Sequence, residues 1–161
     1  MQKTKSTKIM RNKPISLRLP WAPSANEIWR NLRSGAVYLS PKYRSFLHAA
    51  KFEYMAQGSP KINGTPLLQV VLRLFPPSTH SYDVDNRIKP TLDALTKIGL
   101  WKDDRYVRKI TVVANEAVKN GAIIVEIDEF SNETERKTHE TILSWYGLKP
   151  LKSDKSDRRE K

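Results

Sequence analysis

Five aspartates lie close together in a chain that is otherwise strongly basic. They fall within residues 81–104 of a 161-residue chain whose formal net charge is +12. Carboxylates that are brought together repel one another unless a cation or a basic partner lies between them, and hard divalent cations prefer oxygen ligands. The cluster therefore predicts a divalent metal site, and a basic protein that holds such a site is suited to phosphate chemistry. The five residues are Asp83, Asp85, Asp93, Asp103 and Asp104.

The first two aspartates have the spacing of metal ligands. If this part of the chain is extended, Asp83 and Asp85 point to the same side, because side chains alternate along a strand. Residues 86–98 then carry apolar side chains at helical spacing and end at Gly99, which predicts a helix. Asp85 or Asn86 lies near the start of this helix, so an alternative is that one of them only caps it.

The remaining aspartates divide into two kinds. Lys89, Asp93 and Lys97 form an i, i+4 series that is typical of surface ion pairs, and we favour that explanation for Asp93 and Lys97. Surface ion pairs explain neither Asp83 nor the pair at 103–104. That second pair follows the helix, where the chain can return toward Asp83 and Asp85. Three carboxylates from two loops suit Mg²⁺, which takes few protein oxygens and keeps water ligands for a substrate.

Other kinds of metal site do not fit this sequence. The chain has no cysteine, which excludes disulfides, thiolate zinc sites and thiol nucleophiles, and favours a reducing compartment. A calcium-binding EF-hand loop that opens at Asp83 needs an acidic or amide residue at 87 and glycine at 88, whereas the chain has Arg87 and Ile88. The three histidines are too scattered for a compact zinc motif: His48, His80 and His139.

The charge balance indicates the class of partner. The chain has 29 Lys and Arg against 17 Asp and Glu, which favours a polyanion because basic side chains placed on phosphates release condensed counterions. Basic proteins also bind anionic membranes or are only made soluble by their charge. No run approaches the roughly 20 apolar residues that cross a bilayer, and the N-terminus lacks the apolar core of a secretory signal. We therefore expect a cytoplasmic protein that binds nucleic acid and has no membrane span.

The hydrophobic pattern predicts an α+β fold in a single compact domain. It indicates a mixed sheet of about four to five strands, two main helices and a short C-terminal helix within residues 131–147. The apolar run at 67–75 predicts a central strand covered on both faces. The strands predicted at 110–114 and 123–127 are separated by Asn120-Gly121, which predicts a hairpin. The other elements are a strand at 15–19 and helices at 41–57 and 86–98.

Three short motifs follow one another through the acidic window. They are DVDNRIK at 83–89, DALTKIG at 93–99 and WKDD at 101–104. Their order and spacing resemble, without gaps, those of the RusA family of Holliday junction resolvases, whose core reads D-x-D-N-x-x-K, then D-A-L-T-K-x-G, then aromatic-x-D-D. A looser resemblance extends over residues 15–129.

The resemblance implies a metal-dependent endonuclease that acts as a homodimer on four-way DNA junctions, with a mixed α/β fold. Carried over by position, it implies that Asp83, Asp85 and Asp104 hold the metal and that Lys89 assists. The expected metal is Mg²⁺, for which Mn²⁺ can substitute. The neighbouring residues Asn86 and Asp103 are candidates for a supporting role. Candidate DNA contacts are Tyr82, Arg87, Lys89, Lys97 and Arg30.

Two roles are possible for the aromatic residues in the N-terminal part of the chain. Trp21, Trp29 and Arg30 could stack on bases, but aromatic residues beside prolines more often pack a loop onto the core, and we favour packing. Tyr82 precedes the first aspartate, where related sequences often have basic residues, so the junction contacts of this chain are expected to differ.

Composition and the extent of the resemblance together predict a domain organisation. We expect a basic N-terminal arm (1–13), a RusA-like nuclease domain (14–130), a C-terminal helical extension (131–148) and a charged tail (149–161). Two other functions stay open: an architectural protein that binds junctions without cleaving them, and a flap or non-specific nuclease that uses the same carboxylates. The sequence does not distinguish a bacterial from a phage origin.

Overall fold

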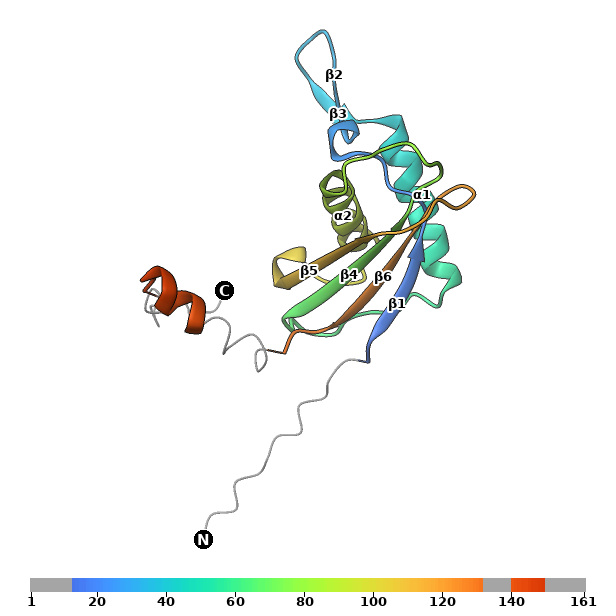
Figure 1. Cartoon of the computed structure of the whole chain (residues 1–161). Coiled ribbons are helices and arrows are strands. Elements are labelled where there is room, and N and C mark those ends of the chain that lie inside the picture. Colours follow the sequence, from blue (N-terminus) through green and yellow to red (C-terminus); the bar gives the residue numbers. More distant parts are fainter. Residues whose placement is uncertain (1–12, 132–139, 150–161) are drawn as a thin grey trace, which may run out of the picture. The chain divides into compact units, whose positions relative to one another are not determined.

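A mixed four-stranded sheet underlies the part of the chain that carries the acidic window (Figure 1). In spatial order, β1 (Ile15–Leu19) pairs antiparallel with β6 (Ala122–Glu129), and β6 pairs antiparallel with β4 (Leu68–Phe75). The fourth strand, β5 (Val107–Ala114), pairs parallel with the other side of β4. The predicted α+β fold with a mixed sheet is confirmed.

The computed structural model describes residues 13–131 and 140–149. The chain divides into two compact units, one that ends at Phe130 and one that begins at Ser131. In the second unit, residues 140–146 are helical and Gly147 follows with a φ of 61°, as the sequence predicts for the end of the short C-terminal helix. Almost all of the expected basic arm and charged tail lies outside the described residues.

Two helices cover one face of the sheet. The first, α1 (Pro41–Ala56), begins where Ser40 Oγ accepts a hydrogen bond from the backbone N–H of Tyr43 at 3.1 Å. The second, α2 (Ile88–Ile98), ends at Gly99, whose φ of 86° suits glycine. Side chains from both helices join one buried core with alternate residues of β1, β4 and β6. No helix in the two described stretches is long and apolar enough to cross a membrane.

Strand β4 is central in the sheet, as predicted, but the prediction that both its faces are covered is wrong. Leu68, Leu72 and the other even-numbered residues are buried, whereas the odd-numbered residues are only partly buried. On that open face, Arg73 Nε lies 2.9 Å from Glu126 Oε1 on β6. This open face therefore mixes polar and apolar side chains, and Gln69 and Arg73 within the apolar run belong to it.

The predicted hairpin between the last two strands is also wrong. Strands β5 and β6 lie on opposite sides of β4 and do not pair with each other. The loop that joins them passes the end of β4, where the N–H groups of Asn115 and Val118 donate to the carbonyls of Leu74 and Pro76 at 2.8 and 2.9 Å. An Asn-Gly turn is a local signal, and it does not determine which strands pair.

The connection from β4 through α2 to β5 sets the geometry of the acidic window. Because β4 and β5 are parallel, Val107 at the start of β5 pairs with Leu68 at the start of β4. Helix α2 therefore runs from the end of β4 back toward its beginning. The helix has 11 residues, which makes it roughly 16 Å long at 1.5 Å per residue. Residues just before and just after α2 thus lie at opposite ends of this helix.

A second, two-stranded sheet projects from the larger unit (Figure 1). Strands β2 (Trp29–Asn31) and β3 (Val37–Leu39) form a hairpin between the single turn η1 (Ala25–Glu27) and α1. The packing prediction is correct for Trp21, which lies against the core, and wrong for Trp29, which is 54% exposed on the hairpin.

Candidate functional site

The acidic loop, residues 76–87, connects β4 to α2. Asp83 and Asp85 are both exposed, and Asp85 opens the single turn η2 (Asp85–Arg87) that runs directly into α2. Among the residues that the structure describes, no side chain caps η2 or α2, so the alternative in which Asp85 or Asn86 serves as a cap is wrong. Asn86 Nδ2 instead donates to Asp83 Oδ2 at 3.1 Å. Within the described residues the Asp85 carboxylate has no hydrogen bond or ion pair, which leaves it available to a ligand.

Lys89 lies on the first turn of α2 and points along the helix. Its Nζ is 3.0 Å from Asp93 Oδ2, which is part of the predicted i, i+4 series. The series does not continue as predicted, because the Lys97 ammonium lies 5.0 Å from the ring centroid of Tyr43. The Lys89 side chain is 65% exposed, so its ammonium can leave Asp93 without opening the core.

The second acidic pair lies beyond the other end of α2. Asp103 caps the turn η3 (Asp104–Tyr106): its Oδ1 accepts a hydrogen bond from the backbone N–H of Arg105 at 2.9 Å. Asp104 is half-buried and its carboxylate forms no hydrogen bond or ion pair in the described part of the chain. Asp103 is therefore engaged in local structure, whereas Asp104 is not.

One chain does not gather the three predicted metal ligands. Asp83 and Asp85 precede α2 and Asp104 follows it, so the helix separates them. Across residues 13–131 and 140–149, no group of three or more His, Asp or Glu side chains could hold a metal ion. The expectation that the chain returns Asp104 to the first pair is not met within a single chain.

Arg87 occupies a position that the sequence did not reveal. Its guanidinium carbon lies 5.0 Å from the ring centroid of Trp21 and 5.9 Å from that of Tyr82, and the two rings meet edge to face at 5.1 Å. One guanidinium nitrogen donates to the carbonyl of Ala22 at 2.8 Å. We call these four residues the Arg87 clamp. Its members come from segments about 65 residues apart, so no local pattern predicts it.

Burial dominates the electrostatics of the clamp. It lowers the pKa of Arg87, an effect opposed by the Glu27 carboxylate, the Tyr82 phenol group and the Asp83 carboxylate. It also raises the pKa of Tyr82, which the positive charge of Arg87 opposes. Both Arg87 Nε and the Tyr82 hydroxyl are buried, and neither has a hydrogen-bond partner within residues 13–131 and 140–149. Arg87 and Tyr82 thus point inward, and their evident role is to fix the acidic loop to the segment at 20–22.

Replacing Arg87 with methionine should destabilise the fold. The substitution removes a stacked, half-buried cation and leaves the Ala22 carbonyl without its donor, so we expect the free energy of unfolding to fall by about 1–3 kcal/mol in urea denaturation. Arg105→Met is the matched control, because Arg105 stacks on Tyr106 at 5.1 Å but is exposed. Equal stability of the two variants would contradict the clamp.

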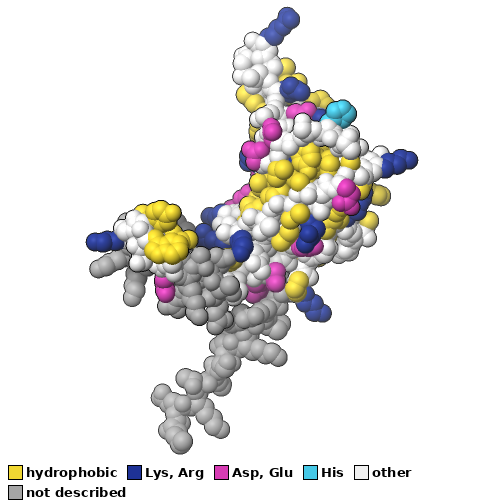
Figure 2. Space-filling model, viewed as in Figure 1, with side chains coloured by type: hydrophobic (Ala, Val, Ile, Leu, Met, Phe, Trp, Pro, Cys, Tyr) yellow, Lys and Arg dark blue, Asp and Glu magenta, His cyan; other side chains and the backbone are white. Residues whose placement is uncertain are grey.

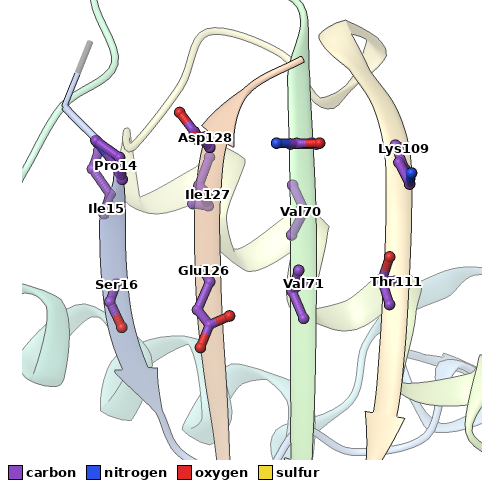
Figure 3. A pocket seen from close by; sticks show the side chains of 11 residues that line it. Pro14, Ile15, Ser16, Val70, Val71, Lys109, Thr111, Glu126, Ile127 and Asp128 are labelled. Carbon is purple, nitrogen blue, oxygen red and sulfur yellow. The ribbon is translucent and has the colours of Figure 1, made fainter. Parts of the chain in front are cut away.

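One hollow lies away from the acidic loop. It has a volume of about 480 Å³ and is formed on the open face of the sheet (Figure 3). Two carboxylates line it, but Glu126 pairs with Arg73, and Asp128 Oδ1 accepts the N–H of Glu129 at 2.7 Å. These carboxylates are engaged, and the hollow is a weaker candidate than the acidic loop.

Comparison with known proteins covers most of the chain. Residues 20–128 match the family described as Endodeoxyribonuclease RusA. The chain belongs to the RusA family. A crossover junction endodeoxyribonuclease of Enterobacteria phage 82 is 31% identical over 116 residues, which cover 71% of this chain and 94% of the relative. The RusA proteins of Shigella sonnei and Escherichia coli K12 are each 30% identical over 118 residues, which cover 73% of this chain and 97% of theirs.

The RusA match covers most of the larger unit. It runs from the segment that holds Trp21 to the end of β6, and it includes every candidate site residue. Membership of the RusA family makes this protein an endodeoxyribonuclease. Among solved structures, the periplasmic domain of Helicobacter pylori MotB aligns at 13% identity, over 89% of this chain and 88% of that one, with a TM-score of only 0.32.

Proposed function

We propose that this protein resolves four-way DNA junctions as a Mg²⁺-dependent homodimer that nicks two opposed strands. The single observation that carries the proposal is the pair Asp83 and Asp85, which is exposed and does not cap the helix. The pair lies just before α2 in a RusA-family chain of net charge +12. The substrate is supported by the relatives, which are named crossover junction endodeoxyribonucleases. Such a protein acts where DNA recombines, in the cytoplasm of a bacterium or a phage-infected cell.

The donor set suits the proposed metal. It consists of carboxylate oxygens, which Mg²⁺ and Mn²⁺ prefer, and two exposed carboxylates leave room for water and phosphate. One chain supplies Asp83 and Asp85 but not Asp104, because α2 lies between them. In a two-fold dimer, each chain can supply a metal ligand to the site of its partner and receive the same ligand from the partner. We therefore assign the third ligand to Asp104 of the partner subunit.

The chemistry falls to a small number of side chains. Mg²⁺, when bound, counters the negative charge that develops on the phosphate and favours an activated water. Asp83 and Asp85 would hold it next to the DNA backbone. Lys89 follows on the first turn of α2, and its ammonium can move from Asp93 to the scissile phosphate. A cation placed there stabilises charge that grows in the transition state more than it strengthens ground-state binding.

Two sites related by two-fold symmetry explain paired nicks. A four-way junction has approximate two-fold symmetry, and resolution requires one cut in each of two opposed strands. A dimer with isologous contacts presents two equivalent sites with matching orientation.

A cleavage assay on a synthetic four-way junction tests this function. With Mg²⁺ we expect symmetric paired nicks, and without it only a protein–DNA complex. Flap, duplex and single-stranded DNA should be run at the same salt concentration, because salt alters apparent preference. Binding without product in Mg²⁺ would favour an architectural protein, and equal cleavage of every substrate would favour a non-specific nuclease.

Lys89→Ala should slow junction cleavage about 10²-fold, as expected when a donor to developing charge is lost. Junction affinity should change little, because the ammonium is one of many basic groups. Single-turnover rates and titrations in Ca²⁺ separate the two quantities. The control is Lys51→Ala, an exposed lysine on α1. A normal rate with strongly weakened binding would make Lys89 an anchoring residue instead.

A further inference from the structure

The hairpin of residues 29–39 exposes apolar side chains that the fold does not use. Trp29, Leu32, Val37 and Tyr38 are 54%, 51%, 59% and 39% exposed. Trp29 and Tyr38 lie on opposite faces of the hairpin, and large exposed apolar groups on a projecting element mark an interaction site. The hairpin stands clear of the body of the larger unit (Figure 1), and Figure 2 shows a basic side chain at its tip.

Hydrogen bonds fix the base of the hairpin to the start of α1. Ile28 is buried, and its carbonyl accepts a hydrogen bond from the N–H of Ser40 at 2.8 Å. The Ser40 hydroxyl donates to the carbonyl of Glu27 at 2.5 Å. At the tip, Gly35 turns the chain with a φ of 84°. The strands pair in register, so Arg30 lies opposite Tyr38.

This base lies next to the acidic loop. The turn η1, which leads into the hairpin, contacts both η2 and α2. Asp85 is the first residue of η2 and Lys89 is the second residue of α2. A nucleic acid positioned over the candidate site is therefore within reach of the hairpin.

Charge identifies the partner. No acidic residue occurs between Glu27 and Glu53, and Arg30 and Arg33 are both exposed on the hairpin. In a two-fold contact between copies of this chain the same basic surface would meet itself, which is unfavourable. A surface that combines aromatic rings with arginines and excludes acids is suited to bases and phosphates.

We propose that the hairpin enters the centre of a branched DNA molecule, where Trp29 and Tyr38 stack on base pairs at the branch point. This inference rests on the proposed function and names the feature of the substrate that the hairpin recognises. In a continuous duplex, an inserted side chain must first unstack a base step, at a cost of a few kcal/mol. At a branch point the stack is already interrupted, so the rings cover exposed base faces without that cost. The hairpin thus selects junctions over duplex.

The test uses Asp85→Asn protein, which keeps the substrate intact, with Trp29→Ala or Tyr38→Ala added. Each added substitution should weaken binding to a four-way junction by about 5- to 150-fold, equivalent to 1–3 kcal/mol for one stacked base. Affinity for a duplex of the same length should change less than about twofold. A 2-aminopurine beside the branch point should change its fluorescence on binding, and Trp29→Ala should reduce that change. Phe52→Ala is the control, because Phe52 is 75% exposed on α1.

Three results would overturn the proposal: equal losses on junction and duplex, no loss on either, or a shift in sedimentation that identifies the hairpin as a contact between protein copies. Cleavage by the unaltered protein is measured separately. If that protein binds junctions without nicking them while the hairpin variants lose binding, the proposed function fails and the hairpin inference stands. If it nicks junctions and the hairpin variants bind normally, the reverse holds.

Discussion

Asp85→Asn should abolish Mg²⁺-dependent nicking of a four-way junction while junction binding persists. The substitution keeps the size of the side chain and removes one of the two carboxylates that a chain offers at the start of α2. Metal-ion stabilisation contributes several kcal/mol and each 1.36 kcal/mol is tenfold, so we expect a loss on the order of 10³-fold or more in the single-turnover rate. Junction affinity should be equal or higher, because one negative charge no longer repels phosphate.

The control for Asp85→Asn is Glu116→Gln, which makes the same change of charge at an exposed carboxylate in the loop between β5 and β6. Glu116 lies outside the acidic loop, so its replacement should leave the nicking rate within a few-fold of the unaltered protein. Folding should be intact in both variants, because Asp85 forms no hydrogen bond or ion pair in the described part of the chain. If Asp85→Asn cleaved junctions at the normal rate, the assignment of the acidic loop as the catalytic site would be wrong.

Mixing two inactive variants should restore activity if the site is shared between chains. Asp85→Asn and Asp104→Asn should each be inactive alone. After subunit exchange at equal concentration, about half of the dimers are mixed, and each mixed dimer has one site with both native contributions. The mixture should therefore regain about a quarter of the native sites, and it should produce single nicks rather than paired ones.

A mixture that stays inactive would mean that one chain supplies all three carboxylates. If all three carboxylates came from one chain, every site in a mixed dimer would lack one ligand and the mixture would stay inactive. Asp103→Ala serves as the control for the second acidic pair. Because Asp103 caps η3, this variant should lose about 1 kcal/mol of stability and retain most of its activity.

Local patterns in the sequence were sufficient for most of the fold. The structure confirms the predicted helix start at residue 41 and the predicted helix end at Gly99, because capping and left-handed glycine depend on neighbouring residues alone. Strand pairing depends on distant residues, and Asn120-Gly121 therefore predicted a hairpin that does not form. The apolar run of β4 likewise did not reveal that Arg73 and Glu126 share an open face.

The contrast between local patterns and contacts of distant residues also applies to the candidate site. Asp83 and Asp85 were recognisable from their spacing and from the RusA motif. The Arg87 clamp was not, because Trp21 and Arg87 come together only when the fold forms. The separation of Asp104 from the first pair follows from the parallel pairing of β4 and β5, which no motif encodes. Conversely, the exposure of Trp29 contradicts the expectation that aromatic residues beside prolines pack inward.

Anomalous scattering from Mn²⁺ in crystals of the protein is the most direct test of the shared metal site. We predict a peak at about 2.2 Å from carboxylate oxygens of Asp83 and Asp85 and of Asp104 of the partner subunit, a distance close to that of Mg²⁺–oxygen bonds. The peak should disappear in Asp85→Asn crystals grown under the same conditions. A Mn²⁺ peak elsewhere, with the acidic loop bound to no metal at saturating concentration, would contradict the assignment.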